Sequence, residues 1–241
     1  MAQILRNLYS PNFDNKKRSK KSIKFIIIHY TGMKKETDAL KKLTDFYSKV
    51  SCHYFIRNNG SVLRLVHDNY ISWHAGKSFW KKYQLLNKNS IGIEISNSGH
   101  ENKYTKFKTN QIKSLISLLK KLKKKYNIQK ENILGHSDIS IDRKKDPGEK
   151  FPWKILARNQ LTLWPDKQFS RFRLKKLDII QKELFIKNVL KIGYRLNPKI
   201  KKKKTNFQKL ITTAFQRKFR GELVNGKIDL ECYFLSENLV K

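Results

Sequence analysis

Two kinds of hydrophobic pattern run along the chain, and the first predicts strands. Continuous apolar runs at 22–30, 90–96 and 133–134 indicate buried strands, because strands that are covered on both faces lack polar alternation. Segments 53–57 and 61–66 flank an Asn-Asn-Gly sequence, which is a hairpin signal.

The second pattern has helical spacing. Apolar residues recur every three to four positions over 36–50 and 110–126, and lysines occupy the opposite face of the second segment. A further helix is predicted over 154–161. Strands that alternate with helices predict an α/β fold with one mixed central sheet flanked by helices.

After Pro165 the pattern changes to helices alone. Segments 175–190 and 206–219 have apolar residues at helical spacing, and a basic loop at 199–204 joins them. We therefore expect two domains: an α/β domain over 1–167 and a small all-α domain over 168–241.

The charge of the chain is extreme. The 241 residues include 54 Lys and Arg against 19 Asp and Glu, for a net charge of +35. Such a charge fits an anionic partner such as nucleic acid, a membrane surface or cell wall, but a bias toward lysine throughout the chain explains it equally well. The basic runs at 16–21, 120–125 and 199–204 then read as solvated faces and linkers. They carry no aromatic RNA-binding motif, so we do not expect nucleic acid to be the primary partner.

Other features narrow the class of protein. Cys52 and Cys232 differ in context and do not indicate a disulfide framework. No segment has the ~18 consecutive apolar residues of a membrane span, and 1–22 has no apolar stretch of the signal-peptide type. The sequence carries no signal for an oligomeric state.

Three residues at the ends of predicted elements could share a metal. His29 follows a buried strand, His136 follows Ile-Leu-Gly, and Asp146 precedes Pro-Gly on a loop that can return to them. Two imidazoles and one carboxylate leave the fourth position of a tetrahedral zinc open, as in catalytic zinc sites. Each residue also has an ordinary interpretation, since single histidines are usually structural and Asp-Pro-Gly is a common turn.

Glu94 stands inside the apolar strand Ile-Gly-Ile-Glu-Ile. Alternation places Ile91, Ile93 and Ile95 on one face and Gly92 with Glu94 on the other. An unpaired buried carboxylate costs several kcal/mol, so Glu94 either lines a cleft or points to solvent on a half-exposed sheet.

Two further groups could serve the same site. Lys144 lies two residues before Asp146 and can approach the same metal, although lysines are abundant in this chain. Trp73 and His74 lie on a glycine-containing loop and could line a sugar or peptide cleft, or else anchor the loop on the core.

Taken together, these segments resemble the type 2 N-acetylmuramoyl-L-alanine amidases, which share a fold with peptidoglycan recognition proteins. The resemblance runs from about residue 10 to 153, and within the family the AmiD-like zinc amidases are most similar. The matching motifs are Ile28-His29-Tyr30-Thr31-Gly32, Cys52-His53-Tyr54, Trp73-His74-Ala75-Gly76, Ser90-Ile91-Gly92-Ile93-Glu94, Gly135-His136-Ser137-Asp138, Asp146-Pro147-Gly148 and Phe151-Pro152-Trp153.

This resemblance implies a function and roles for individual residues. His29, His136 and Asp146 would bind Zn²⁺, Glu94 would be the catalytic glutamate, and Lys144 would stabilise the transition state. We expect Tyr30, Trp73 and His74 to contact sugar or peptide. The implied reaction is hydrolysis of the amide between N-acetylmuramic acid and L-alanine, in cell-wall turnover or recycling. Intact and 1,6-anhydro substrates both remain possible.

The resemblance also leaves two alternatives. A non-catalytic peptidoglycan-binding recognition protein is the alternative function. Residues 168–241 resemble a helical peptidoglycan-binding module, on the basis of Ala214-Phe215-Gln216-Arg217 and 224–229. The bacterial envelope or periplasm is the compartment that the family implies, and the cytoplasm is the alternative because no lipobox or signal peptide is visible.

Overall fold

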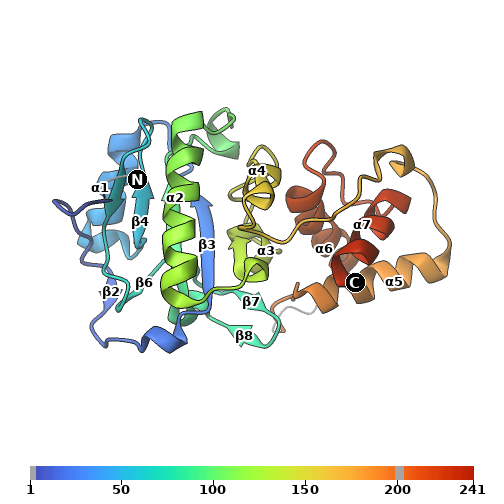
Figure 1. Ribbon diagram of the computed structural model, residues 1–241, viewed down its shortest axis with the longest axis horizontal. Coiled ribbons are helices and arrows are strands. Elements are labelled where there is room, and N and C mark those ends of the chain that lie inside the picture. The colour runs from blue at the N-terminus through green and yellow to red at the C-terminus, as the bar shows by residue number, and fades with distance from the viewer. Residues whose placement is uncertain (1–3, 199–203) are drawn as a thin grey trace.

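The fold is built on a six-stranded mixed sheet with the order β1-β5-β4-β9-β3-β10 (Figure 1). The computed structural model describes residues 4–198 and 204–241, so most of the predicted basic loop 199–204 lies outside the described residues. Neighbours among β4, β9, β3 and β10 run parallel, and β5 runs antiparallel to β4. The strands are β1 (Ile4–Leu5), β3 (Phe25–Tyr30), β4 (Tyr54–Ile56), β5 (Val62–Arg64), β9 (Ser90–Ile95) and β10 (Ile133–Gly135), with β2 (Phe13–Asp14), β6 (Ile71–Ser72), β7 (Phe79–Trp80) and β8 (Tyr83–Gln84) in two small ribbons.

Seven helices surround the sheet in the described part of the chain, and the mixed α/β architecture predicted from the sequence is confirmed. Helix α2 lies across one face, and α5, α6 and α7 gather beyond α3 and α4, away from α1 (Figure 1). Over 4–198 and 204–241, no helix has the length and apolar character needed to cross a membrane. The helices are α1 (Glu36–Thr44), α2 (Thr109–Tyr126), α3 (His136–Ile139), α4 (Trp153–Arg158), α5 (Ile179–Ile192), α6 (Lys204–Phe219) and α7 (Leu230–Val240).

One predicted helix was too long, and one helix was not predicted. The helix expected over 36–50 ends at Thr44, because the Asp45 carboxylate accepts a hydrogen bond from the Tyr47 N–H and starts a separate 3-10 turn. Phe46 and Tyr47 are therefore exposed instead of lying on an apolar helix face. The second case is α7, which the sequence did not reveal: its Leu-Glu-Cys-Tyr-Phe-Leu run has no single apolar stripe.

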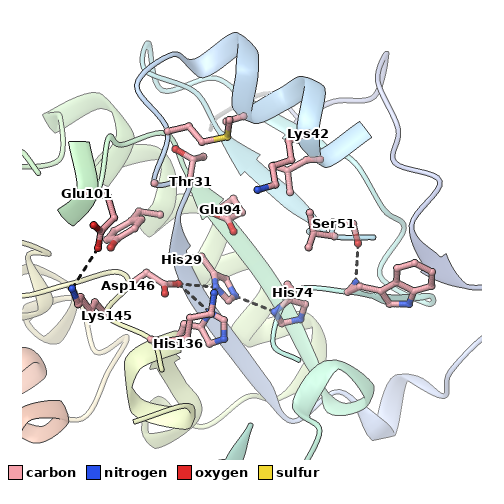
Figure 2. Close-up of a pocket in the computed structure, with 18 of the residues that line it drawn as sticks. His29, Thr31, Lys42, Ser51, His74, Glu94, Glu101, His136, Lys145 and Asp146 are labelled. Atoms are coloured by element: carbon pink, nitrogen blue, oxygen red, sulfur yellow. Dashed lines mark hydrogen bonds and ion pairs between the residues drawn. The ribbon is translucent and has the colours of Figure 1, made fainter. Parts of the chain in front are cut away.

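The register of the parallel strands brings His29 and Glu94 side by side. His29 on β3 is the direct partner of Glu94 on β9. Side chains of paired residues in neighbouring strands point to the same face, so both enter one cleft (Figure 2). The predicted alternation is confirmed, because Ile91, Ile93 and Ile95 belong to the core on the opposite face.

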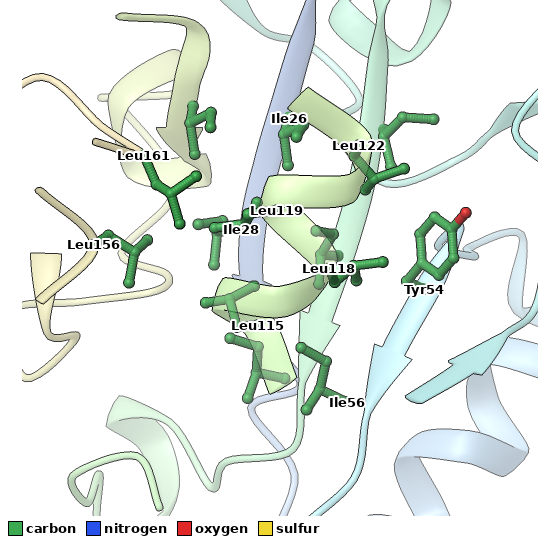
Figure 3. Close-up of a cluster of buried hydrophobic side chains, with 14 of the residues drawn as sticks. Ile26, Ile28, Tyr54, Ile56, Leu115, Leu118, Leu119, Leu122, Leu156 and Leu161 are labelled. Atoms are coloured by element: carbon green, nitrogen blue, oxygen red, sulfur yellow. The ribbon is translucent and has the colours of Figure 1, made fainter. Parts of the chain in front are cut away.

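That opposite face is covered by α2. Its leucines contact β3 and β4, as Figure 3 shows, and α4 closes the side of the cluster. Lysines fill the exposed positions of α2, so the basic run 120–125 is mostly a solvated face, as predicted. The labelled members of this cluster are Ile26, Ile28, Tyr54, Ile56, Leu115, Leu118, Leu119, Leu122, Leu156 and Leu161.

Away from the cleft, part of the same face belongs to a core that includes residues of the C-terminal helices. Phe25, Ile27 and Leu134 of the sheet form one buried cluster with Phe185 of α5 and Phe215 of α6. A boundary between two domains near residue 167 stays a prediction, and the two parts share this core.

One residue of the basic run 16–21, Arg18, is partly buried. The Arg18 guanidinium donates to the carbonyl oxygens of Asp68, Asn87 and Ser90 at 2.7–3.0 Å, and one of its nitrogens lies 2.8 Å from His53 Nε2. Arg18 thereby ties the N-terminal segment to loops that flank β9.

A buried carboxylate joins the sheet to α2. Asp68 accepts hydrogen bonds from the hydroxyls of Tyr54 (2.6 Å) and Tyr126 (2.5 Å) and from Lys125 Nζ (2.8 Å). Burial by itself would raise the pKa of Asp68, but these donors lower it to about 2.

We expect Asp68→Asn to destabilise the protein by about 2 kcal/mol at pH 7, since a carboxyl pKa that is lower in the folded state stabilises the fold above the unfolded value. This contribution is lost as the pH falls from about 4 to about 2. Urea unfolding of the variant, of wild type and of the control Asp166→Asn, which alters an exposed aspartate, measures it. A difference from wild type that stays constant down to pH 2 would contradict the account.

Candidate metal centre and active site

Three elements bring His29, His136 and Asp146 together. His29 is the penultimate residue of β3, and His136 begins α3 directly after β10, which pairs with β3. The loop after α3 returns Asp146 to the same point, where the Ser137 N–H donates to the Asp146 carbonyl at 2.7 Å. Figure 2 shows the three side chains converging.

The potential ligand atoms form a close triangle. His29 Nδ1, His136 Nδ1 and Asp146 Oδ2 are separated by 3.0, 3.0 and 3.1 Å, and all three residues are buried. Tetrahedral zinc with bonds of about 2.0–2.2 Å would separate its ligands by about 3.4 Å, so the triangle needs only a small expansion to hold such an ion.

The partner of His136 determines which ring nitrogen carries the proton. His136 Nε2 lies 3.2 Å from the carbonyl oxygen of Ala75. A carbonyl oxygen only accepts, so Nε2 must carry the proton and Nδ1 presents a lone pair to the triangle. Arg143 Nη2 also approaches His136 Nε2, at 3.4 Å, but lies closer to the carbonyl oxygens of Ala75 and Lys77, at 2.7 and 2.8 Å.

A longer chain of hydrogen bonds selects the same tautomer of His29, with the proton on Nε2 and a lone pair on Nδ1. The Ser90 hydroxyl donates to the Leu86 carbonyl at 2.6 Å, so Ser90 Oγ accepts from His74 Nε2, at 3.1 Å. His74 Nδ1 is then an acceptor for His29 Nε2, at 3.0 Å. Burial first, and then the neighbouring histidines, hold the pKa of His74 well below its usual value, which keeps this ring neutral.

The triangle therefore contains three acceptor atoms and no proton. Burial and the neighbouring His136 lower the pKa of His29 to about 4. Three converging lone pairs repel one another unless a cation lies between them, so the residues fit a divalent metal.

Gly92 makes room for this arrangement. A Cβ at Gly92 would lie 2.4 Å from Cγ of the His74 ring, so only glycine allows the imidazole to pack on β9. Sequence reasoning assigned His74 to substrate contact. Both of its ring nitrogens have protein partners, which favours a role in orienting His29. No direct signal for this contact is visible in the sequence, although a glycine inside a strand often marks a close approach.

Glu94 lies in the cleft, not on an open sheet face. Its Oε2 is buried and has no hydrogen-bond partner among residues 4–198 and 204–241. Burial, and secondly the charge of Asp146, raise the pKa of Glu94 to about 8, while Lys144 and Lys42 act in the opposite direction. A carboxylate with an unsatisfied oxygen beside a potential metal site is suited to binding water and moving a proton.

The cleft has a volume of about 350 Å³. The predicted Tyr30, Trp73 and Lys144 line it, as do Lys42 and Arg143, which sequence reasoning missed. Nothing distinguishes these two cations from the other 52 in the sequence.

Tyr30 is held by a second chain of polar contacts. Its hydroxyl oxygen lies 2.7 Å from His100 Nδ1, and His100 Nε2 lies 2.9 Å from Glu149 Oε2. The His100 backbone N–H also donates to the Tyr30 hydroxyl at 3.4 Å, so His100 fixes the position of the Tyr30 ring at the wall of the cleft.

Comparison with known proteins agrees with this geometry. The family profile described as N-acetylmuramoyl-L-alanine amidase matches residues 19–149. The chain belongs to this family. It is 34% identical to the N-acetylmuramoyl-L-alanine amidase AmiD of Escherichia coli over 234 residues, covering 91% of this chain and 83% of that protein. It is also 32% identical to the 1,6-anhydro-N-acetylmuramyl-L-alanine amidase AmpD of Haemophilus influenzae, covering 62% of this chain and 88% of that protein.

Solved structures give the same result. AmiD of E. coli, in complex with the substrate anhydro-N-acetylmuramic acid-L-Ala-D-γ-Glu-L-Lys, superposes with a TM-score of 0.80 at 33% identity, covering 94% of this chain and 92% of that one. AmpDh3 of Pseudomonas aeruginosa superposes with a TM-score of 0.79 at 27% identity, covering 95% of each chain. The protein is therefore an enzyme, an amidase of the N-acetylmuramoyl-L-alanine class.

We expect His74→Phe to weaken divalent-metal binding about 10- to 100-fold, because it keeps the ring but removes the acceptor that sets the His29 tautomer. Competition with a chromophoric chelator measures the dissociation constant. His67→Phe, on an exposed histidine, is the matched control. Unchanged metal affinity in a folded His74→Phe protein would show that the hydrogen-bond chain from Ser90 through His74 does not orient His29.

Proposed function

We propose that this amidase uses zinc, held by His29, His136 and Asp146, to hydrolyse the amide between N-acetylmuramic acid and L-alanine in muropeptides. One observation carries the proposal: three unprotonated acceptor atoms, 3.0–3.1 Å apart, converge beside a buried carboxylate oxygen that has no partner within the described residues.

The donor set favours zinc over other common ions. Two imidazole nitrogens and one carboxylate oxygen suit zinc, whereas magnesium and calcium prefer ligand sets made of oxygen atoms. Three protein ligands are the number found in catalytic zinc sites, which keep one position open. When bound, zinc would supply Lewis acidity, which polarises an amide carbonyl and makes water more acidic.

Two side chains around the site perform the proton transfer and the charge stabilisation that the reaction needs. Glu94 accepts a proton from the attacking water as the C–O bond forms, and then returns that proton to the leaving amine of L-alanine as the C–N bond breaks. Lys144, on the rim of the same cleft, stabilises the negative charge that develops on the carbonyl oxygen. One donor placed in this way contributes about 3 kcal/mol.

The identity of the substrate is supported by the cleft and by the relatives. Tyr30 and Trp73 line the cleft with aromatic rings, and the indole N–H of Trp73 donates to Asp14 Oδ1 at 2.7 Å. The AmiD complex holds an anhydro-muropeptide, and the AmpD relatives are named for 1,6-anhydro substrates. We therefore propose muropeptides, with or without the 1,6-anhydro end, as the substrate class.

Replacing Glu94 tests the proton-transfer role. We expect Glu94→Gln to keep its zinc and to lose activity by about 10²- to 10⁴-fold, because an amide cannot take the proton from water. Release of stem peptide, together with metal analysis, measures both quantities. Glu101→Gln, on an exposed glutamate at the rim of the same cleft, is the control. Hydrolysis by Glu94→Gln at the wild-type rate would remove Glu94 from the mechanism.

Replacing Asp146 tests the ligand set. Asp146→Ala leaves the two imidazoles without the anionic ligand, so we expect the purified variant to retain well under one zinc per chain after dialysis against a weak chelator. Atomic absorption of the variant and of the exposed-site control Asp166→Ala gives the answer. Full zinc occupancy in Asp146→Ala would exclude this aspartate as a ligand.

A further inference from the structure

The C-terminal helices reach the back of the metal site through Lys218 of α6. Lys218 is 4% exposed, and its Nζ donates to Asp138 Oδ2 at 3.3 Å and to the Ile133 carbonyl at 3.2 Å. The same ammonium group lies 4.5 Å from the centre of the Trp153 ring. This lysine is therefore held in the protein interior by a carboxylate, a carbonyl and an aromatic face.

Asp138 connects that lysine to Gly135, the residue that directly precedes His136. It is fully buried on α3, and its Oδ2 also accepts the N–H of Gly135 at 2.8 Å, while Oδ1 accepts the Tyr194 hydroxyl at 2.8 Å. His136 follows Gly135 as the first residue of α3, and Asp138 lies in the same turn. The direction of the His136 side chain thus depends on a carboxylate whose side-chain donors, Lys218 and Tyr194, both come from the C-terminal part of the chain.

Tyr194 makes a second connection to the site. Its ring lies 4.9 Å from the Trp80 ring, the two residues form a backbone bridge, and the Lys81 N–H donates to the Gly193 carbonyl at 2.8 Å. A Cβ at Gly193 would lie 2.5 Å from the Trp80 indole, so glycine is needed for this close contact.

Trp80 ends the segment that orients both histidines. Residues 74 and 75 of this segment supply the acceptor for His29 and the carbonyl for His136. Contacts from 193 and 194 therefore fix one end of the loop on which the tautomers of both proposed ligands depend.

We propose that Lys218 and Tyr194 are positioning residues for the metal site, which makes the C-terminal helices part of the catalytic apparatus and not only a separate binding module. The inference rests on the proposed metal site. Breaking a buried ion pair leaves the remaining charge uncompensated, so loss of Lys218 should displace Asp138 and, with it, the turn that carries His136.

The test compares metal affinity in full-length variants that differ by one group. Lys218→Met keeps the length of the side chain and removes its charge, and Tyr194→Phe removes only the hydroxyl. We expect each to raise the zinc dissociation constant, about 10-fold for Lys218→Met and less for Tyr194→Phe. Lys187→Met, on an exposed lysine of α5, should bind zinc like wild type.

A double variant separates positioning from general loss of packing. Asp138→Asn added to Lys218→Met removes the uncompensated carboxylate charge while keeping an acceptor for the Gly135 N–H. We expect the double variant to recover most of the zinc affinity lost in Lys218→Met. Circular dichroism and thermal unfolding of each protein show whether it is folded.

The outcomes distinguish this inference from the proposed function. Folded Lys218→Met and Tyr194→Phe proteins that melt earlier but bind zinc as tightly as wild type would overturn the inference, since a purely structural role gives that result. If Lys218→Met does not fold, the zinc affinity of Tyr194→Phe tests the inference alone: a raised dissociation constant supports it, and a wild-type value overturns it. Wild-type protein that fails to bind zinc would instead overturn the proposed function and this inference with it.

Discussion

The meeting of three unprotonated acceptors in a buried triangle is the constraint on which the rest of this site depends. Two imidazole nitrogens and a carboxylate oxygen at 3.0–3.1 Å repel one another, and the surrounding protein holds them there by hydrogen bonds to the outer nitrogens. The Ala75 carbonyl fixes His136, and the chain from Ser90 through His74 fixes His29. A cation is the partner that turns this repulsion into binding.

Two features of the fold produce this geometry: the register of the parallel strands and the room left by a glycine on β9. Pairing of His29 with Glu94 places the proposed base beside the proposed ligand without any contribution from a flexible loop. The absence of a side chain at Gly92 leaves room for His74 behind them. On the far side, Asp138 contacts Lys218 of α6, and both Asp138 and Trp80 contact Tyr194, which follows α5. The helical region therefore contacts the parts of the structure that hold both histidines.

Much of this could be predicted from the sequence, for identifiable reasons. The strand at 25–30 and the helix at 109–126 follow directly from their apolar patterns, and the ends of strands placed His29 and His136 on one edge. Period-two alternation predicted the face of β9 on which Glu94 lies, while its position in a cleft was one of two alternatives. These are local signals, and they need no knowledge of distant contacts.

The rest depends on contacts between residues far apart in the chain. Arg18 stands in a lysine-rich run, yet its guanidinium contacts three backbone carbonyls and the His53 ring. Composition cannot show these contacts. Helix α7 is apolar around its circumference, so it lacks the stripe that reveals a helix. The two partners of His74 lie 45 residues before it and 16 after it, which is why its sequence suggested a substrate contact instead.

The most direct test of the central claim is hydrolysis of defined muropeptides, with and without a 1,6-anhydro end, by zinc-loaded and chelator-treated protein. The account predicts release of the stem peptide at the bond to L-alanine by the zinc-loaded protein. It also predicts loss of that activity after chelation and its return when zinc is added. Equal hydrolysis by loaded and chelated protein, or no hydrolysis of either substrate by fully zinc-loaded protein, would contradict it.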